Sequence, residues 1–328
     1  MISEPDLDFE HPTSPKAGKV HQSKLHSHVL GTSNMNTLGQ AYAPPLKRRW
    51  KLTVAVPCSF VADVPHLREK TSRLGFLGRA LGIFRVDEVV IYADLPAGES
   101  ASQGHFIDSV LSYMETPQHL RKHLVRMNPQ LRFAGILPPL RTPNHPVSPR
   151  LSDLKAGDIR EGVVMEANAQ ISRVDIGVGS LAEIPARLDR GSRVSVRINR
   201  VAPKIVAELI NHSRIDIYWG FRVTLKNLPI GRLIQESGPD VVIATSIRGE
   251  KVDAVLEQLR TSITGASSVL LAFGSPKRGL HEIIAQEGLK LSTVAAFTVN
   301  LVPDQGTRSV RTEEAVYSAL TFLNTISG

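Results

Sequence analysis

The stretch that decides the fold of this chain is Asn300-Leu-Val-Pro303-Asp-Gln305-Gly306-Thr307-Arg308-Ser-Val-Arg311-Thr312-Glu313-Glu314-Ala315. A strand-like apolar run, residues 292–299, precedes it, and apolar residues recur at helical spacing over residues 311–326. A loop between a buried strand and a helix N-terminus is where an open α/β sheet places a ligand, because free backbone N–H groups point outward there. We therefore expect a site in this loop.

The same residues also describe an ordinary helix cap. Thr312 would be the N-cap, and Glu313 and Glu314 would lie favourably at the positive end of the helix. The chemistry of these residues alone leaves a binding loop and a simple cap equally open.

Two other strand-like runs end in polar, glycine-bearing loops. The run over residues 241–245 leads into Thr245-Ser-Ile-Arg248-Gly249-Glu250, and the run over 269–273 leads into Phe273-Gly274-Ser-Pro-Lys-Arg-Gly279. Nearer the start, a strand over residues 51–56, a helix over 65–84 and a strand over 87–94 predict a parallel sheet. Because ligands bind beyond the carboxyl ends of such strands, three loops are expected to surround one small molecule.

The middle of the chain has a different pattern. A proline-rich stretch, residues 138–149, breaks regular structure, and five short strand-like runs follow within residues 151–215. Their number and length predict a small OB-like barrel. This segment contains no Phe, Tyr or Trp, so it lacks the usual base-stacking platform. A phosphate backbone could instead be bound by arginines, for which we single out Arg160, Arg173, Arg193 and Arg197. The alternative is a solvated arginine-rich face.

Composition places limits on the class of protein. The 328 residues can form two domains, and 42% hydrophobic with 21% charged residues is ordinary for a globular protein. The sequence shows no apolar run long enough for a membrane span and no signal peptide, so we expect a cytoplasmic protein without a membrane partner. Cys58 is the single cysteine, and the histidines before residue 48 have no ligand spacing, so no metal is expected.

The charge points to a polyanionic partner without identifying it. The net charge is +8, yet residues 216–328 carry 11 basic and 11 acidic side chains. The basic excess therefore belongs to the rest of the chain, where a partner surface is expected.

Several common enzyme classes are excluded by their motifs. The 274–279 loop departs from the P-loop order, because Gly279 is followed by Leu280 and His281. The chain also lacks a G-x-G-x-x-G fingerprint after its first strand, a G-x-S-x-G elbow and an H-E-x-x-H helix.

The order N-x-x-P-x-Q-G-T-x-x-V-R-T-E-E-A in residues 300–315 closely resembles the C-terminal signature of the SPOUT superfamily of RNA methyltransferases, in the archaeal and eukaryotic branch with an inserted OB-like domain. The resemblance covers about residues 50–328. It implies an α/β fold with a deep trefoil knot, interrupted by an all-β OB-like barrel. The implied domains are a first half of the SPOUT domain (49–150), the insertion (151–215) and a second half with the knot and cofactor site (216–328). The resemblance leaves residues 1–48 unexplained. Their content of His, Ser, Pro and Gly, without sustained periodicity, predicts a disordered extension.

The resemblance also implies a ligand and its residues. The cofactor would be S-adenosylmethionine, bound by Thr245, Arg248, Gly249, Phe273, Gly274, Asn300, Pro303, Gln305, Gly306 and Thr307. If the acceptor is N3 of uridine, Arg311 or Arg248 could stabilise the anion, and Glu313 or Glu314 could accept the proton. The alternative for Arg311 and Glu314 is a salt bridge that caps the helix.

The sequence therefore predicts an S-adenosylmethionine-dependent methyltransferase acting on an RNA base, with ribosomal RNA as the expected partner and a homodimer as the expected assembly. Two alternatives stay open. One is an RNA-binding ribosome-assembly factor with little or no transferase activity, and the other is an enzyme with a different target, such as a pseudouridine or a ribose 2′-hydroxyl.

Overall fold

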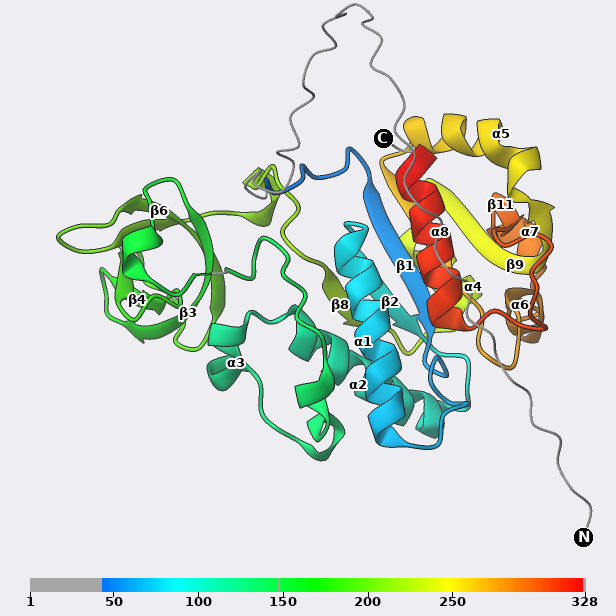
Figure 1. Ribbon diagram of the computed structural model, residues 1–328, viewed down its shortest axis with the longest axis horizontal. Coiled ribbons are helices and arrows are strands. Elements are labelled where there is room, and N and C mark those ends of the chain that lie inside the picture. Colours follow the sequence, from blue (N-terminus) through cyan, green and yellow to red (C-terminus); the bar gives the residue numbers. More distant parts are fainter. Residues whose placement is uncertain (1–42, 147, 327–328) are drawn as a thin grey trace, which may run out of the picture. The chain divides into compact units, whose positions relative to one another are not determined.

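The computed structural model describes residues 43–146 and 148–326 (Figure 1). Of the expected N-terminal extension, residues 1–48, residues 1–42 lie outside the described residues. Leu46 forms an antiparallel bridge with Ile217, and the Lys47 N–H donates to the Asp216 carbonyl at 2.8 Å. Residues 46–47 are thus tied to the segment that follows the predicted insertion.

A six-stranded parallel sheet organises the described chain, in the order β11-β9-β10-β1-β2-β8. Its strands are β1 (Lys51–Pro57), β2 (Glu88–Tyr92), β8 (Arg222–Leu225), β9 (Val241–Lys251), β10 (Ser268–Ala272) and β11 (Phe297–Asn300). The inner strands are nearly continuous apolar runs because helices cover both faces of the sheet. The mixed α/β class and the parallel sheet are confirmed.

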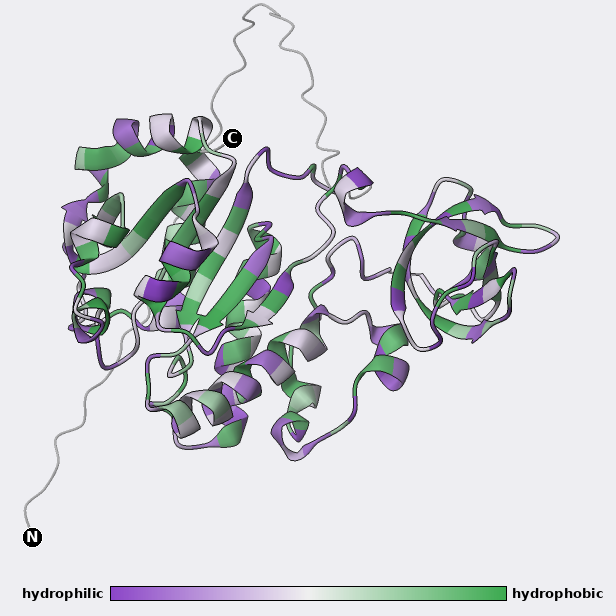
Figure 2. Cartoon of the chain, turned by 180° about the vertical axis from the view of Figure 1, so that it is seen from behind, coloured by the Kyte–Doolittle hydropathy of each residue, from purple (hydrophilic) through white to green (hydrophobic). Residues whose placement is uncertain are grey.

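Successive residues of the four inner strands, β1, β2, β9 and β10, enter different cores. These strands are mostly hydrophobic, as Figure 2 shows. Leu271 packs on one face beneath α1 (Leu67–Ile83), α2 (Ala97–Glu115), α5 (Val252–Thr264) and α8 (Thr312–Ile326), and Leu270 packs on the other beneath α4 (Ile230–Ser237), α6 (Leu280–Gln286) and α7 (Leu291–Val294). On the first face α1 and α8 lie side by side, as Figure 1 shows. The start of α8 is thereby held at the carboxyl edge of the sheet.

A closed five-stranded β-barrel interrupts the α/β pattern, with neighbouring strands in the order β3-β4-β5-β7-β6. The strands are β3 (Ile159–Ala167), β4 (Ser172–Asp175), β5 (Leu181–Ile184), β6 (Arg193–Arg200) and β7 (Val206–Leu209). Alternate residues such as Val174, Val196 and Ile198 fill its interior. The prediction of a small barrel in this segment is confirmed. A short helix, α3 (Gln118–Leu124), and one-turn 3₁₀ helices at 129–131, 134–136 and 151–153 lie between α2 and the barrel, and another at 212–214 follows it.

Two predicted elements differ from the structure. The run over residues 292–299 was expected to be one strand, but α7 occupies its first part and β11 begins only at Phe297. β9 was expected to end at residue 245, yet it continues to Lys251, where Glu250 and Lys251 pair with Val299 and Asn300. The polar sequence of residues 246–251 by itself suggests a turn, and the pairing of Glu250 and Lys251 with β11 extends the strand through it.

No helix in residues 43–146 or 148–326 is long and apolar enough to cross a membrane.

Candidate functional site

Three loops meet at the carboxyl edge of the sheet and enclose a cavity of about 310 Å³. One loop follows β10 and another follows β11. The third is the polar second half of β9. Six of the ten predicted cofactor residues line this cavity: Thr245, Arg248, Phe273, Gly274, Asn300 and Gln305. The cavity lies in the size range of small-molecule sites, about 300–1,000 Å³. Residues nearly 60 positions apart in the chain thus share one pocket.

The other four predicted residues lie outside the lining. Gly249 belongs to β9, where an added Cβ would lie 2.6 Å from the Thr298 carbonyl oxygen, so glycine allows the close approach of β11. Pro303, Gly306 and Thr307 belong to the loop between β11 and α8. The Thr307 carbonyl accepts a hydrogen bond from the Gln305 amide at 2.8 Å, which folds this loop on itself.

Polar groups of the predicted residues hold the cavity wall together. The Thr245 hydroxyl donates to the Ala272 carbonyl at 3.0 Å, joining β9 to β10. The Asn300 side chain donates to the Ile247 carbonyl at 3.3 Å and accepts from the Val302 N–H at 3.1 Å. Both side chains therefore fix the positions of the loops that line the cavity.

A pair of opposite charges lies at the cavity. An Arg248 guanidinium nitrogen is 3.8 Å from Glu282 Oε1, and the side chains are 71% and 51% exposed. Because exposed ion pairs are weak, both groups can exchange this contact for a ligand at little cost.

The start of α8 carries cavity residues and predicted catalytic residues on different sides. Thr312 and Ala315 line the cavity, whereas Arg311, Glu313 and Glu314 lie outside its lining. The Arg311 N–H donates to Glu314 Oε2 at 2.9 Å, the bond by which the third residue of a helix caps its N-terminus. The expected cap is thus formed through the Arg311 backbone, and Thr312 is the first helical residue instead of the N-cap.

Glu313 lies against α1. Its side chain is buried, and Oε1 lies 3.4 Å from the Arg73 guanidinium. Oε2 has no hydrogen-bond partner among the described residues. A buried carboxylate oxygen without a donor is unusual and calls for a partner.

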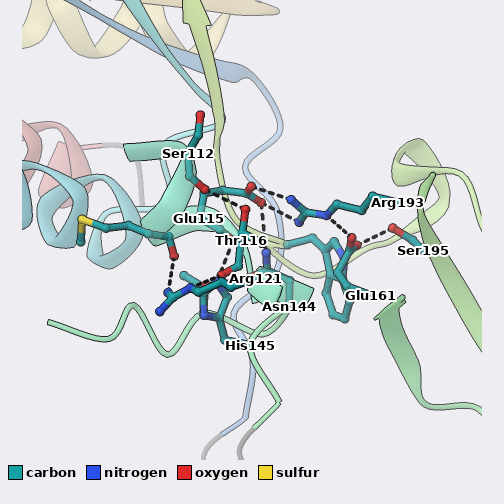
Figure 3. Close-up of polar contacts among 12 residues, drawn as sticks. Ser112, Glu115, Thr116, Arg121, Asn144, His145, Glu161, Arg193 and Ser195 are labelled. Atoms are coloured by element: carbon teal, nitrogen blue, oxygen red, sulfur yellow. Dashed lines mark hydrogen bonds and ion pairs between the residues drawn. The ribbon is translucent and has the colours of Figure 1, made fainter. Parts of the chain in front are cut away.

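The predicted RNA-binding arginines have different surroundings. Arg193 donates to both carboxylate oxygens of Glu115 at 2.6 and 2.7 Å and to Glu161 at 2.7 Å (Figure 3). Burial lowers the pKa of Arg193 but the two carboxylates raise it, with a net rise. These contacts join β6 of the barrel to α2, so Arg193 has a structural role in the fold. The others are Arg160, half-buried; Arg173, paired with Glu166 and Glu183; and Arg197, 4.0 Å from Glu208.

Glu161 is the centre of a buried polar cluster. Its carboxylate accepts from Ser195 and, at 2.6 Å, from the Trp219 indole, in addition to Arg193. Burial raises the pKa of Glu161, but hydrogen bonds from His212, Ser195 and Arg193 and the charge of Arg193 hold it at about 2.

Sequence reasoning missed several residues of the cavity. Ser275, His281, Glu282 and Arg308 also line it. His281 and Glu282 belong to the first turn of α6, directly after the second loop, so their place at a helix N-terminus was a usable signal. Among the described residues, no group of three His, Cys, Asp or Glu side chains is arranged to hold a metal ion.

Comparison with known proteins shows which family the chain belongs to. Residues 51–323 match the model of a family described as "Putative RNA methyltransferase". An uncharacterised protein of Haloarcula marismortui is 34% identical over 286 residues, covering 83% of this chain and 98% of the relative. The 28S rRNA (uridine-N(3))-methyltransferases of Mus musculus and Homo sapiens are 30% and 28% identical, over 84% of this chain and 76% and 78% of theirs. The chain is therefore a member of this RNA methyltransferase family.

Proposed function

We propose that this protein uses S-adenosylmethionine to methylate a base of ribosomal RNA, with N3 of uridine as the specific target. The observation that carries the proposal is the single cavity of about 310 Å³ lined by residues from all three loops. The relatives named as 28S rRNA uridine-N3 methyltransferases support the choice of acceptor. The trefoil knot and the homodimer implied by the sequence resemblance are further parts of this proposal.

The residues of the cavity fit this cofactor chemically. Its amino-acid end carries one carboxylate and one ammonium group. Arg248 can pair with the carboxylate, and Glu282 can pair with the ammonium group. Phe273, Leu301 and Ala315 supply apolar surface for the adenosine end. When bound, the cofactor supplies an electrophilic methyl group. No covalent enzyme nucleophile is then required, which agrees with the absence of a nucleophile motif from the sequence.

The chain's own residues have to position the acceptor and handle its proton. Uridine N3 carries a proton that must leave, and the resulting anion requires a nearby cation. The proposed cations are Arg248, which lines the cavity, and Arg311, which lies in the chain between the lining residues Val310 and Thr312. Of the two proposed bases, Glu314 is engaged by the Arg311 N–H, whereas Glu313 keeps one oxygen without a partner among the described residues. Since the Glu313 side chain is buried beside Arg73 and both carboxylates lie outside the cavity lining, neither is preferred as the proton acceptor.

Nucleoside mass spectrometry of ribosomal RNA from cells with and without the gene tests the proposal. Loss of 3-methyluridine is the expected result, and loss of a different methylated nucleoside would contradict the proposed acceptor.

Calorimetry with S-adenosylmethionine separates the enzyme from an RNA-binding assembly factor of the same fold. Absence of binding heat, with RNA binding retained, would favour the assembly factor.

A further inference from the structure

A buried carboxylate lies beyond the end of β2, outside the residues that line the cavity. The Asp94 side chain has no exposed surface. Its Oδ1 accepts from the Ser59 N–H and the Cys58 thiol, both at 3.1 Å, and its Oδ2 accepts from the Ser59 hydroxyl at 2.5 Å. A buried charge is costly unless it is paired and hydrogen-bonded, so this cluster calls for a cation.

That cation comes from the second of the three loops. An Arg278 guanidinium nitrogen donates to the Asp94 backbone carbonyl and lies 3.6 Å from its Oδ2. The other terminal nitrogen of Arg278 donates to the Gln286 side chain at 2.8 Å. Arg278 therefore links the end of β2 to the segment that connects β10 with α6.

The loop held by Arg278 forms part of the cavity wall. Within it, the Ser275 N–H donates to the Arg278 carbonyl at 2.9 Å, and the Arg278 N–H donates to the Ser275 hydroxyl at 3.0 Å. Gly274 fits closely inside this turn, since an added Cβ would lie 2.9 Å from the Arg278 carbonyl oxygen. Gly274, Ser275 and Gly279 line the cavity. Movement of Arg278 would therefore change the shape of the cavity.

β2 also holds the beginning of the same loop. The Tyr92 hydroxyl donates to the Phe273 carbonyl at 2.7 Å, and both side chains are buried. Phe273 lines the cavity, and its N–H donates to the Ala55 carbonyl of β1 at 3.1 Å. Two residues of one strand end thus fix both ends of the loop, Tyr92 at Phe273 and Asp94 at Arg278.

We propose that Asp94 and Tyr92 are positioning residues that set the shape of the 273–279 loop and thereby the affinity of the cavity for its ligand. Neither side chain lines the cavity, so each acts through the loop. The identity of the ligand, S-adenosylmethionine, rests on the function proposed above. The link between β2 and the loop does not depend on that identity.

The chain offers matched controls for both residues. Asp240 lies at the opposite edge of the sheet, and its carboxylate accepts from Ser267 and Ser268. Tyr218 is a buried tyrosine whose hydroxyl donates to the Val86 carbonyl at 3.0 Å, outside the 273–279 loop. Asp240→Asn, at an exposed carboxylate, and Tyr218→Phe, at a buried hydroxyl, therefore make the same chemical changes without touching the loop.

The experiment compares Asp94→Asn and Tyr92→Phe with these controls in the full chain. Amide hydrogen exchange of residues 273–280 is measured without ligand, and binding of S-adenosylhomocysteine is measured by calorimetry. We expect Asp94→Asn to speed exchange in the loop and to weaken binding, each by about tenfold, because Arg278 keeps its bond to the backbone carbonyl but loses the carboxylate charge 3.6 Å away. Tyr92→Phe should weaken binding by about threefold, as a neutral hydrogen bond predicts. RNA affinity should stay within about twofold of the wild type in every variant, because Asp94 and Tyr92 are buried and contacts to phosphates carry most of the affinity of a protein for RNA.

A conservative variant separates positioning from general destabilisation. Arg278→Lys keeps the cation and should retain most of the affinity. Arg278→Gln should weaken binding at least as much as Asp94→Asn, because it also removes the bonds to the Asp94 carbonyl and to Gln286. Because Asp94 acts on the loop through Arg278, the double variant should be no weaker than Arg278→Gln alone. Wild-type loop exchange in Asp94→Asn, or equal weakening by Asp240→Asn, would overturn the proposal. Should the wild type fail to bind S-adenosylhomocysteine, the proposed function fails, and loop exchange alone still decides the positioning role.

Discussion

At the scale of single residues, two glycines of the predicted motif can be separated by their surroundings. An added Cβ at Gly249 would meet the backbone of Thr298 at 2.6 Å, whereas one at Gly306 would meet nothing within 4 Å. We expect Gly249→Ala to lower the free energy of unfolding by about 1–3 kcal/mol, since the clash is with backbone that cannot rotate away. Gly306→Ala should leave that free energy unchanged.

Chemical denaturation of both variants measures these free energies, and cofactor titration adds a second comparison. If Gly306 is a glycine because a ligand approaches its backbone, Gly306→Ala weakens S-adenosylhomocysteine binding at unchanged stability. Equal stability of the Gly249→Ala variant and the wild type would show that β9 and β11 can separate without cost.

At the scale of elements, the start of α8 provides a test of cap against catalytic base. Glu314 accepts from the Arg311 N–H, and glutamine can form the same bond. Glu314→Ala should therefore destabilise the protein by about 0.5–2 kcal/mol, and Glu314→Gln by clearly less. Methyl transfer by Glu314→Gln at close to the wild-type rate would identify a cap. Loss of transfer in this variant at unchanged melting temperature would identify a base.

The elements also show how far the sequence could be read. The helix α8, the barrel and the order of strands and helices follow from apolar periodicity, which is a local signal. The second half of β9 could not be predicted, because residues 246–251 are mostly polar and become a strand only through β11, about 50 positions later. The pairing of Arg193, a predicted RNA-binding residue, with carboxylates is hidden in the sequence for a similar reason. Its partners Glu161 and Glu115 lie 32 and 78 positions away, so no local pattern reveals the pairing.

At the scale of the whole molecule, the Glu115–Arg193–Glu161 cluster connects α2 to the barrel (Figure 3). Arg193→Met would leave two carboxylates without their cation, which should cost about 3–5 kcal/mol of unfolding free energy. Arg197→Met, in an exposed pair on the same strand, should cost about 1 kcal/mol or less. Urea denaturation compares the two variants, and equal costs would mean that the cluster does not hold the barrel to α2.

The same junction makes the whole molecule sensitive to pH through His145. Its Nε2 lies 2.8 Å from the Glu115 carbonyl oxygen, and burial lowers its pKa from the ordinary value of about 6.5 to about 4, with the nearby charges of Arg121 and Arg193 adding to the effect. A histidine with a lowered pKa binds more protons when the chain is unfolded, so its neutral form stabilises the fold fully above pH 6.5 and loses this contribution as the pH falls toward 4. We expect the wild type to lose about 1–3 kcal/mol of unfolding free energy over that window from this group.

Denaturation at a series of pH values measures this loss. His145→Gln should flatten the decline, because glutamine can donate to the same carbonyl without binding a proton. His66→Gln, at an exposed histidine before α1, should leave the slope as it is. An unchanged slope in His145→Gln would mean that another group at the junction carries the pH dependence. His119 is the first to examine, because burial lowers its pKa as well and its contribution is lost as the pH falls below about 6.5, whereas that of Glu161 is lost only from about 4.5 toward 2.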